Sequence, residues 1–325
     1  MLLEVGILLV LLYYLFRYYW EQPTIEGFDR KAVLITGCDS GFGKLLAIKC
    51  AHAGFPVFAG CLSEEGVAAL KPVKNMRPFL LDVTSDESVT KAVYFVTREL
   101  RSSECLWAVV NNAGVFSCYG PDDWCTVTEY QKAMDVNTFG MIRVTQAFKP
   151  FLKRSKGRLV SITSAAGRIA LPGVGPYCVA KYAGEAYMDV VRQELHKFGV
   201  KCSILEPGLF KTNLINRTAM DKRVNDVWEK LSQAQRDEYG EQYKSYYLNR
   251  WHWLTNTLGS DSVDQVVDSY FHAITALHPR TRYLCGWGAK LYLIPGSYLP
   301  TGLLDFLIRT IAYESQKPAV LKGNH

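Results

Sequence analysis

Short apolar runs alternate with longer segments of mixed polarity between residue 31 and about residue 208. Strand-like runs lie at 31–36, 56–62, 79–83, 106–111, 158–163 and 201–205, and helix-like segments lie at 44–53, from 64, 84–100, about 128–152 and about 177–198. Continuous apolar runs are typical of strands buried on both faces, and their alternation with helices favours a parallel sheet. The pattern predicts an α/β fold, a single doubly wound, Rossmann-like parallel sheet.

The N-terminus carries an unbroken apolar run at residues 5–16, followed by Arg17 and an aromatic triplet at 18–20. A helix over 5–20 would reach about 24 Å, short of a hydrocarbon core of about 30 Å, but Arg17 could extend to the headgroups that Tyr and Trp favour. A cleaved signal peptide is one alternative, but bulky residues follow the run where cleavage needs small ones. A buried core helix is the other alternative. The run predicts an uncleaved membrane anchor over 1–22, with membrane lipid as a partner.

The rest of the chain divides into three parts by pattern. A polar linker spans 23–30, the predicted dinucleotide-binding catalytic core spans 31–208, and 209–325 complete the same domain. Within the last part, residues 209–260 have a helical, polar and aromatic-rich pattern. We interpret them as an insertion on the substrate side of the active site, and a surface helix pair without a substrate role is the alternative. The apolar segment 299–313 fits a second membrane-contacting helix, a dimer face or a core helix equally well.

Composition and charge exclude several classes of protein. Hydrophobic residues make up 49% and charged residues 21% of the chain, which is typical of a globular protein rather than a disordered one. The net charge of +6 is spread without a Lys/Arg run, so we expect no nucleic acid as a partner. The nine cysteines include no CxxC pair and the histidines no HExxH, so neither a disulfide framework nor a metal site is predicted.

A glycine-rich turn follows the first predicted strand and precedes the first predicted helix. It contains Gly37, Asp39, Ser40, Gly41, Phe42 and Gly43. Glycines at this place let the backbone approach a pyrophosphate, whose charge the helix N-terminus then stabilises. A second turn, Asn111 to Gly114, follows the fourth strand at the same edge of the sheet, where ligands of such folds bind. Each turn alone is also explained by the turn preference of its residues.

Tyr177 and Lys181 stand four residues apart on a predicted helix and therefore share one face. A phenol has a pKa of about 10, and a neighbouring ammonium would stabilise the phenolate and lower that value. The pair could thus exchange a proton with an alcohol. Ser164 follows the fifth strand, where its hydroxyl could bond the reacting oxygen. Taken alone, a Tyr-x-x-x-Lys pair is better explained by an exposed helix face.

Together these motifs, in this order, resemble the short-chain dehydrogenase/reductase family over residues 31–215. The resemblance implies that Tyr177 is the catalytic acid/base, that Ser164 positions the substrate oxygen, and that Lys181 also holds the nicotinamide ribose. It implies that Asn137 supports a proton-relay water. The remaining cofactor-binding positions that it implies are Cys61, Leu62, Asp82, Val83, Asn112, Ala113, Gly114, Pro207 and Gly208, beside the residues of the glycine-rich turn.

Closer similarity, over 35–43, 58–62 and 206–213, is to the retinol and hydroxysteroid dehydrogenase branch, whose members are commonly anchored to the endoplasmic reticulum. The stretch 176–181 also resembles mitochondrial 3-hydroxybutyrate dehydrogenase, so a mitochondrial membrane is the alternative location. Glu4 precedes the apolar run, whereas Arg17, Arg30 and Lys31 follow it. The positive-inside rule therefore predicts a cytosolic catalytic domain.

NAD is the predicted cofactor, although the acidic residue that usually binds the adenosine ribose is missing. Cys61 and Leu62 stand at its place at the end of the second strand. The negatively charged 2′-phosphate of NADP would meet the carboxylates of Asp39, Glu64 and Glu65 there, and these would repel it. Lys44 is the only nearby cation that could offset this repulsion.

Three functions remain open from the sequence. The leading prediction is an NAD-dependent oxidoreductase that interconverts a lipophilic alcohol, such as retinol or a hydroxysteroid, and its carbonyl. A short hydroxy-acid dehydrogenase of the 3-hydroxybutyrate type and a catalytically silent lipid-binding protein are the alternatives. A homodimer is left open.

Overall fold

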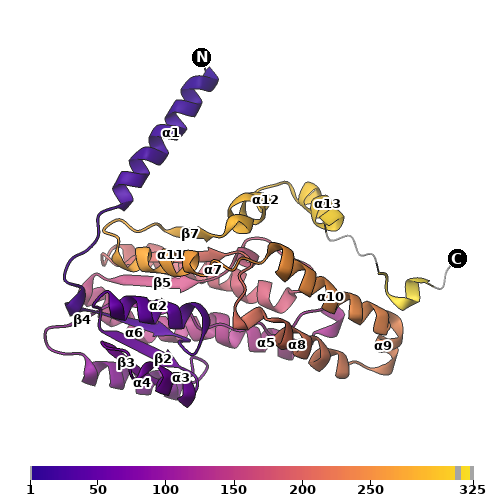
Figure 1. The fold of residues 1–325 in the computed structure, drawn as a ribbon, viewed down its shortest axis with the longest axis horizontal. Coiled ribbons are helices and arrows are strands. Elements are labelled where there is room, and N and C mark those ends of the chain that lie inside the picture. The colour runs from indigo at the N-terminus through magenta and orange to yellow at the C-terminus, as the bar shows by residue number, and fades with distance from the viewer. Residues whose placement is uncertain (1, 312–315, 323–325) are drawn as a thin grey trace.

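The computed structural model describes residues 2–311 and 316–322 and contains one seven-stranded parallel sheet (Figure 1). The strands are β1 (Lys31–Thr36), β2 (Val57–Cys61), β3 (Met76–Leu80), β4 (Cys105–Asn111), β5 (Arg158–Ile162), β6 (Lys201–Pro207) and β7 (Arg282–Cys285). Their spatial order is β3-β2-β1-β4-β5-β6-β7. The strand order therefore reverses between β1 and β4, and the carboxyl ends there form the crevice in which doubly wound sheets bind ligands. The predicted Rossmann-like sheet is confirmed.

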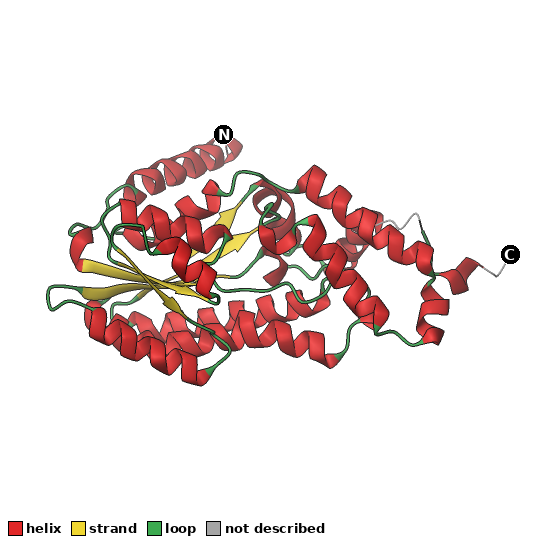
Figure 2. Cartoon of the chain, turned by 60° about the horizontal axis from the view of Figure 1, so that its bottom comes forward, coloured by secondary structure: helices red, strands yellow, loops and turns green. Residues whose placement is uncertain are grey.

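Helices cover both faces of the sheet, as Figure 2 shows. They are α2 (Gly41–His52), α3 (Glu64–Leu70), α4 (Asp86–Glu99), α5 (Val127–Met134), α6 (Met141–Ser155), α7 (Gly175–His196) and α11 (Asp264–Thr275). On one face, α2 and α11 pack on alternate strand residues such as Val33 and Ile35. On the other face, α4, α6 and α7 pack on the intervening ones, such as Leu34. Both faces are buried, which explains the continuous apolar runs of the strands.

Some predicted boundaries differ from the structure. The third strand ends at Leu80 rather than at residue 83, because the Asp82 carboxylate accepts bonds from the Thr84 amide (2.8 Å) and hydroxyl (2.7 Å) and turns the chain. The helix predicted at about 128–152 is α5 and α6 joined by a π-helical turn, Asp135–Gly140. The four-residue strand β7 was not predicted.

The N-terminal helix α1 (Leu2–Glu21) projects from the body, and its large apolar side chains are exposed (Figure 1). Its last turn is fixed to the domain. The Arg280 guanidinium donates to the Glu21 carboxylate (2.7 Å), and the Trp20 ring stacks on His278 with centroids 4.1 Å apart. Across residues 2–311 and 316–322, none of the helices has both the length and the apolarity that crossing a membrane requires.

Residues after β6 form further helices at the carboxyl end of the sheet. These are α8 (Arg217–Glu229), α9 (Gln233–Tyr239), α10 (Glu241–Leu258), α12 (Ile294–Gly296) and α13 (Thr301–Ile311). The helical pattern expected over 209–260 is present in α8 to α10. Of the segment 299–313, residues 312 and 313 lie outside the described residues. Phe306 in α13 is exposed, so α13 is not the core helix that was one of the alternatives.

Candidate active site

Three of the four predicted catalytic side chains, Ser164, Tyr177 and Lys181, lie together at the carboxyl edge of the sheet. Ser164 follows β5, where its hydroxyl donates to the Pro207 carbonyl oxygen (3.3 Å). Tyr177 lies in the first turn of α7, which Pro176 helps to start at a position that needs no N–H partner. Lys181 lies one turn later, with its Nζ 5.5 Å from the centre of the Tyr177 ring. Its ammonium donates to the Ile162 carbonyl oxygen (3.3 Å) at the end of β5.

Burial shifts the ionisation of this group. It raises the pKa of Tyr177 to about 12, opposed by a hydrogen bond from Ser164. It also lowers the pKa of Lys181 to about 8, opposed by the negative charge of Glu185. The lowering of the Tyr177 pKa that was expected from Lys181 is therefore not found, because burial of the phenol raises the pKa instead.

Asn137 lies in the π-helical turn between α5 and α6, and its side-chain amide bonds the backbone of the loop after β4 at both ends. Its Oδ1 accepts from the Val115 N–H (2.8 Å) and its Nδ2 donates to the Val115 carbonyl oxygen (2.9 Å). A Cβ added to Gly114 would lie 3.1 Å from this Oδ1 and 3.8 Å from Nζ of Lys181. The Asn137 side chain therefore fixes the loop after β4 beside Lys181. The relay role expected of Asn137 stays a prediction.

A buried charge cluster lies behind Lys181. Glu185, one turn further along α7, accepts bonds from the Thr163 hydroxyl and the Arg282 guanidinium. Arg282 also donates to Glu206 (2.6 Å), which is fully buried and lies two residues before Gly208. Arg282 thus ties α7 to β6 and β7 directly behind the reactive side chains, a contact that no sequence motif indicated.

The glycine-rich turn and the turn after β4 meet at the reversal point. Gly37 and Gly41 have φ of 69° and 59°, which favour glycine. A Cβ on Gly43 would lie 2.3 Å from Nδ2 of Asn112, and one on Gly37 would lie 2.8 Å from the Ala113 Cα. The Asn112 Nδ2 donates to the Thr36 carbonyl oxygen (2.9 Å). A Cβ on Gly41 would meet open space. The backbone here therefore forms a close-packed turn with an open outer side that fits a pyrophosphate.

Asp39 supplies the carboxylate that the sequence lacks at the end of β2. Its oxygens accept from the N–H groups of Leu62 and Ser63, both at 2.9 Å, and from the Ser63 hydroxyl (2.7 Å). Burial opposes its ionisation, but these bonds outweigh burial and lower the pKa of Asp39. An acidic group therefore stands next to Leu62 after all, brought there by folding from a turn 23 residues away.

The other predicted cofactor-binding residues lie around the same edge in different environments. Cys61 is buried and Leu62 is exposed. The Asp82 carboxylate accepts a hydrogen bond from the Thr84 N–H within its own turn, and the Val83 side chain packs close to Gly140. The remaining positions are Ser40 at the N-terminal cap of α2, Phe42 packed on Phe210 (5.8 Å between ring centres), and Pro207 and Gly208 at the end of β6.

The Tyr177 ring packs at the edge of an aromatic cluster. The Phe116 ring stacks on the Tyr177 ring at 4.8 Å, and the Trp251 ring of α10 lies 5.5 Å from Phe116 and 4.7 Å from Tyr119. These rings belong to one apolar cluster that joins the loop after β4 to α8, α9 and α10. The sequence prediction missed Phe116 and Tyr119, although both follow Gly114 within five residues.

Comparison with known proteins agrees with this arrangement. A family profile described as short chain dehydrogenase matches residues 31–223. Similar curated proteins include 3beta-hydroxysteroid dehydrogenase dhs-16 of Caenorhabditis elegans, 42% identical over 98% of this chain and 85% of that protein. Retinol dehydrogenase 16 of Mus musculus is 40% identical over 95% of this chain and 97% of that protein. Human 17-beta-hydroxysteroid dehydrogenase type 6 is 40% identical over 91% and 93%.

Solved structures share the fold at lower identity. A short chain dehydrogenase/reductase from Burkholderia phymatum, in complex with NAD, aligns with a TM-score of 0.67 at 20% identity, over 87% of this chain and 97% of that chain. A short chain dehydrogenase from Burkholderia cenocepacia, in complex with NADP, aligns with a TM-score of 0.66 at 20% identity, over 87% and 99%.

Proposed function

Because the chain belongs to the short-chain dehydrogenase/reductase family, we propose that it is an NAD-dependent oxidoreductase acting on a lipophilic secondary or allylic alcohol and its carbonyl. The observation that carries this proposal is the grouping of Ser164, Tyr177 and Lys181 under the aromatic rings of Phe116 and Trp251. An apolar alcohol held there would place its hydroxyl against polar groups and its carbon skeleton against rings.

When bound, the nicotinamide supplies a hydride acceptor for the carbinol carbon. The protein's own part is to move the hydroxyl proton and to hold the oxygen. Tyr177 takes the proton from the alcohol, and Ser164 donates to the oxygen as the C–O bond becomes a carbonyl. Lys181 would supply positive charge for the Tyr177 phenolate, and the negative charge of Glu185 helps to keep Lys181 protonated. In the reverse direction Tyr177 returns the proton.

The preference for NAD is supported by the position of Asp39. A carboxylate at the end of β2 accepts hydrogen bonds from ribose hydroxyls and repels a 2′-phosphate. Asp39→Asn keeps the side-chain shape and removes the charge, so it should raise kcat/KM for NADP relative to NAD. The matched control is Glu194→Gln, an exposed carboxylate on α7 that lies outside the predicted cofactor site. An unchanged NADP to NAD ratio in Asp39→Asn would contradict this assignment.

The substrate class is tested by measuring NADH formation by the full-length protein in detergent micelles. We expect turnover with retinol or a hydroxysteroid and none above background with 3-hydroxybutyrate, because the rings over Tyr177 match an extended apolar skeleton. Turnover with 3-hydroxybutyrate alone would favour a hydroxy-acid dehydrogenase. Binding of the lipophilic compounds without turnover under any condition would favour a catalytically silent lipid-binding protein.

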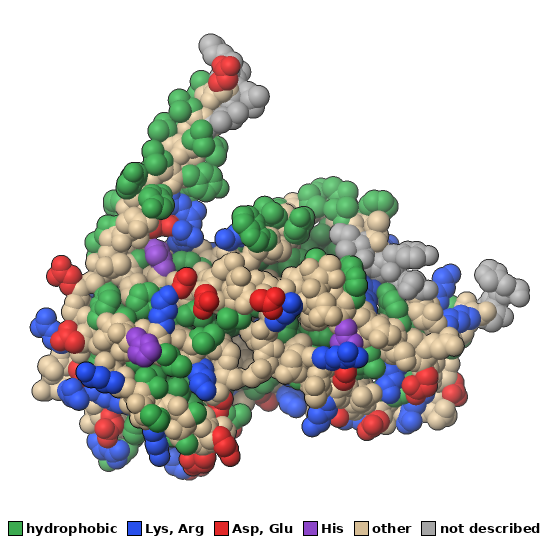
Figure 3. Space-filling model, viewed as in Figure 1, with side chains coloured by type: hydrophobic (Ala, Val, Ile, Leu, Met, Phe, Trp, Pro, Cys, Tyr) green, Lys and Arg blue, Asp and Glu red, His purple; other side chains and the backbone are tan. Residues whose placement is uncertain are grey.

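We further propose that α1 inserts into the membrane of the endoplasmic reticulum and leaves the catalytic domain on the cytosolic side. The support is its exposed apolar surface, such as Leu8, Leu12 and Phe16, on a helix that stands clear of the body (Figure 3). Full-length protein should resist carbonate extraction, and Leu8→Arg with Leu12→Arg should release it. Fractionation distinguishes the endoplasmic reticulum from mitochondria, and release of the unchanged protein by carbonate would contradict insertion.

A further inference from the structure

Large apolar side chains are concentrated on one exposed surface near the C-terminus, which we call the C-terminal apolar patch. It consists of Trp287, Leu291, Tyr292, Tyr298, Leu303, Phe306 and Leu307, exposed by between 37% and 73%. In Figure 3 these hydrophobic side chains gather over α12 and α13. Other exposed apolar side chains of the catalytic domain, such as Leu45, Tyr94 and Val127, lie on different helices, α2, α4 and α5. A concentrated patch marks a surface that contacts another apolar phase.

Helix α13 has few contacts with the domain. Leu304 and Ile308 are half-buried, whereas Leu303, Phe306 and Leu307 are exposed. A polar edge is present too, since Asp305 and Arg309 pair at 3.7 Å. An apolar helix side next to a charged edge suits the boundary between acyl chains and headgroups.

The patch faces the same side of the body as α1 (Figures 1 and 3). The two are joined through one edge of the sheet. The base of α1 is fixed by the Glu21–Arg280 pair, and β7 starts two residues after Arg280 and leads directly to Trp287. The Ile25 N–H also donates to the Thr275 carbonyl oxygen (2.8 Å), which holds the segment after α1 on the domain. Insertion of α1 would therefore bring the patch towards the same bilayer.

Two further features favour lipid over a second copy of the chain. The patch contains Trp287, Tyr292 and Tyr298. Trp and Tyr are the residue types that prefer the headgroup layer of a bilayer. Lys290 lies 5.7 Å from the centre of the Trp287 ring, and with Arg309 it adds positive charge beside the patch. Long cationic side chains can reach lipid phosphates while their stems stay on apolar surface.

The patch also lies directly behind the catalytic residues. Ala165, next to Ser164, packs with Ala289 and Ile294 of the segment that carries α12. Arg168 donates to the hydroxyl of Tyr298 (2.8 Å) with one nitrogen and to Glu206 (3.0 Å) with the other. A Cβ on Gly208 would lie 3.2 Å from the Ala289 N. The patch and the active site therefore share one wall.

We propose that the C-terminal apolar patch lies in the interfacial layer of the bilayer that α1 enters, so that lipophilic substrate reaches Tyr177 from the membrane rather than from water. This inference rests on the proposed function for its substrate and for the insertion of α1. It adds a second membrane contact, and it places the route of substrate entry along the α12–α13 side.

The test is hydrogen–deuterium exchange of the full-length protein with and without vesicles of phosphatidylcholine and phosphatidylserine. We expect exchange in 301–311 to slow by about tenfold or more on vesicles, since several large apolar side chains leave water. Protection of α1 alone would overturn the patch proposal and leave the anchor intact. Protection of neither would overturn both. Protection of 301–311 that depends on protein concentration without vesicles would assign the patch to a second copy and overturn lipid contact.

A variant separates lipid contact from other causes of protection. Leu303→Ser, Phe306→Ser and Leu307→Ser together should abolish the vesicle-dependent protection and lower kcat/KM for a retinoid supplied in vesicles, but not for one in detergent micelles. The matched control changes three exposed apolar residues elsewhere, Tyr94→Ser, Val127→Ser and Val190→Ser. Equal loss in both triple variants, or no loss in the patch variant, would overturn the proposal. Absence of turnover by the unsubstituted protein, both in vesicles and in detergent micelles, would instead contradict the proposed oxidoreductase function.

Discussion

The floor and the cap of the candidate active site are built in different ways. The floor, formed by Ser164, Tyr177 and Lys181, stands on strand ends and on α7, and Arg282 and Glu206 support it from behind. The cap, formed by Phe116, Tyr119 and helices α8 to α10, is held mainly by ring contacts around residues such as Trp251. Charges and directional hydrogen bonds fix atoms to within a narrow range, whereas aromatic packing fixes mostly shape.

This difference separates two tasks. In the proposed function, proton transfer needs a set geometry between a few polar atoms, which the floor would provide through the sheet. Substrate choice needs an apolar surface of suitable shape, which the cap would provide. Changes in the floor should therefore affect turnover and folding, whereas changes in the cap should affect substrate binding.

The largest effect is expected from Tyr177→Phe, which removes the proton-transferring hydroxyl from the floor. Turnover should fall by about a hundredfold to ten-thousandfold, because general acid/base catalysis is lost. The Kd for NAD should stay nearly unchanged, and Tyr182→Phe on the exposed side of the same helix is the control. Steady-state rates within threefold of the unsubstituted protein would remove Tyr177 from the mechanism.

Arg282→Met tests the support of the floor. It leaves the buried carboxylates of Glu185 and Glu206 without their shared cation, so the free energy of unfolding should fall by about 3–5 kcal/mol. Arg192→Met removes a half-exposed pair with Asp189 (3.1 Å), a carboxylate that keeps its bond from Arg282 (2.6 Å), and should cost at most about 1 kcal/mol. Urea unfolding compares the two variants, and similar losses in both would show that the cluster is not a specific support.

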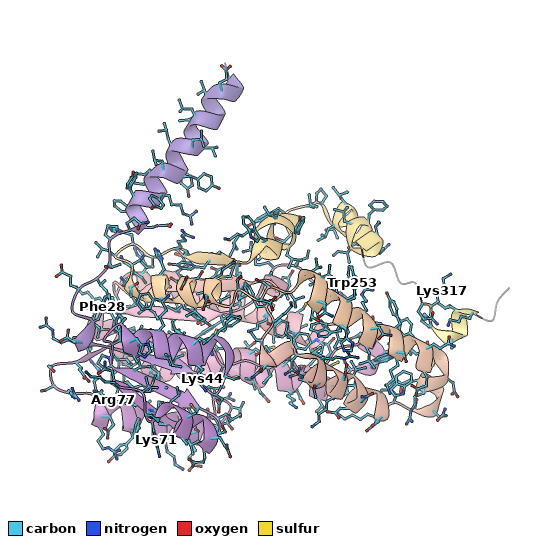
Figure 4. All side chains as sticks on the ribbon, viewed as in Figure 1. Phe28, Lys44, Lys71, Arg77, Trp253 and Lys317 are labelled. Carbon is cyan, nitrogen blue, oxygen red and sulfur yellow. The ribbon has the colours of Figure 1, made fainter. Side chains whose placement is uncertain are left out.

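Trp251→Leu tests the cap. The change removes ring contacts with Phe116 and Tyr119 worth about 0.5–1.5 kcal/mol, so KM for the lipophilic alcohol should rise by up to about tenfold. The Kd for NAD should not change. The exposed Trp253 on the same helix, labelled in Figure 4, provides the control, Trp253→Leu. A larger effect on NAD binding than on KM would contradict the separation of floor and cap.

The smallest effect is expected from Glu185→Gln, and it should be visible in how kcat/KM depends on pH. The charge of Glu185 raises the pKa of Lys181, which burial lowers to about 8. Without that charge Lys181 loses its proton at lower pH, and the alkaline loss of kcat/KM should begin at lower pH. Glu194→Gln, an exposed position on α7, should leave the profile in place. A lower kcat with an unmoved alkaline limb would mean that Glu185 acts on structure alone.

The sequence predicted the floor much better than the cap. The strands and the turns after them have local signatures, such as the glycines at 37–43 and the continuous apolar runs, because each element meets its requirements within a few residues. Asp39 shows the limit of this reasoning. Its place at the end of β2 depends on a turn 23 residues away from Leu62, so the end of β2 appeared to lack an acid.

The missed features share a physical cause, which is that they arise from contacts between distant segments. Arg282 meets Glu185 across 97 positions, and neither residue is unusual in its own neighbourhood. Likewise β7 is too short for a periodic pattern, and the meeting of Phe116 with Trp251 depends on how the cap helices fold back. The pKa of Tyr177 was expected to fall because the sequence shows the neighbouring Lys181 but not the extent of burial.

The central claim is that a hydride passes from the carbinol carbon of a lipophilic alcohol to NAD while Tyr177 takes the hydroxyl proton. The direct measurement uses retinol or a hydroxysteroid deuterated at the carbinol carbon, with the full-length protein and NAD. The account predicts deuterium in the reduced nicotinamide, a primary isotope effect on turnover, and loss of label transfer in Tyr177→Phe. Label released to water, or label transfer that persists in Tyr177→Phe at the unsubstituted rate, would contradict it.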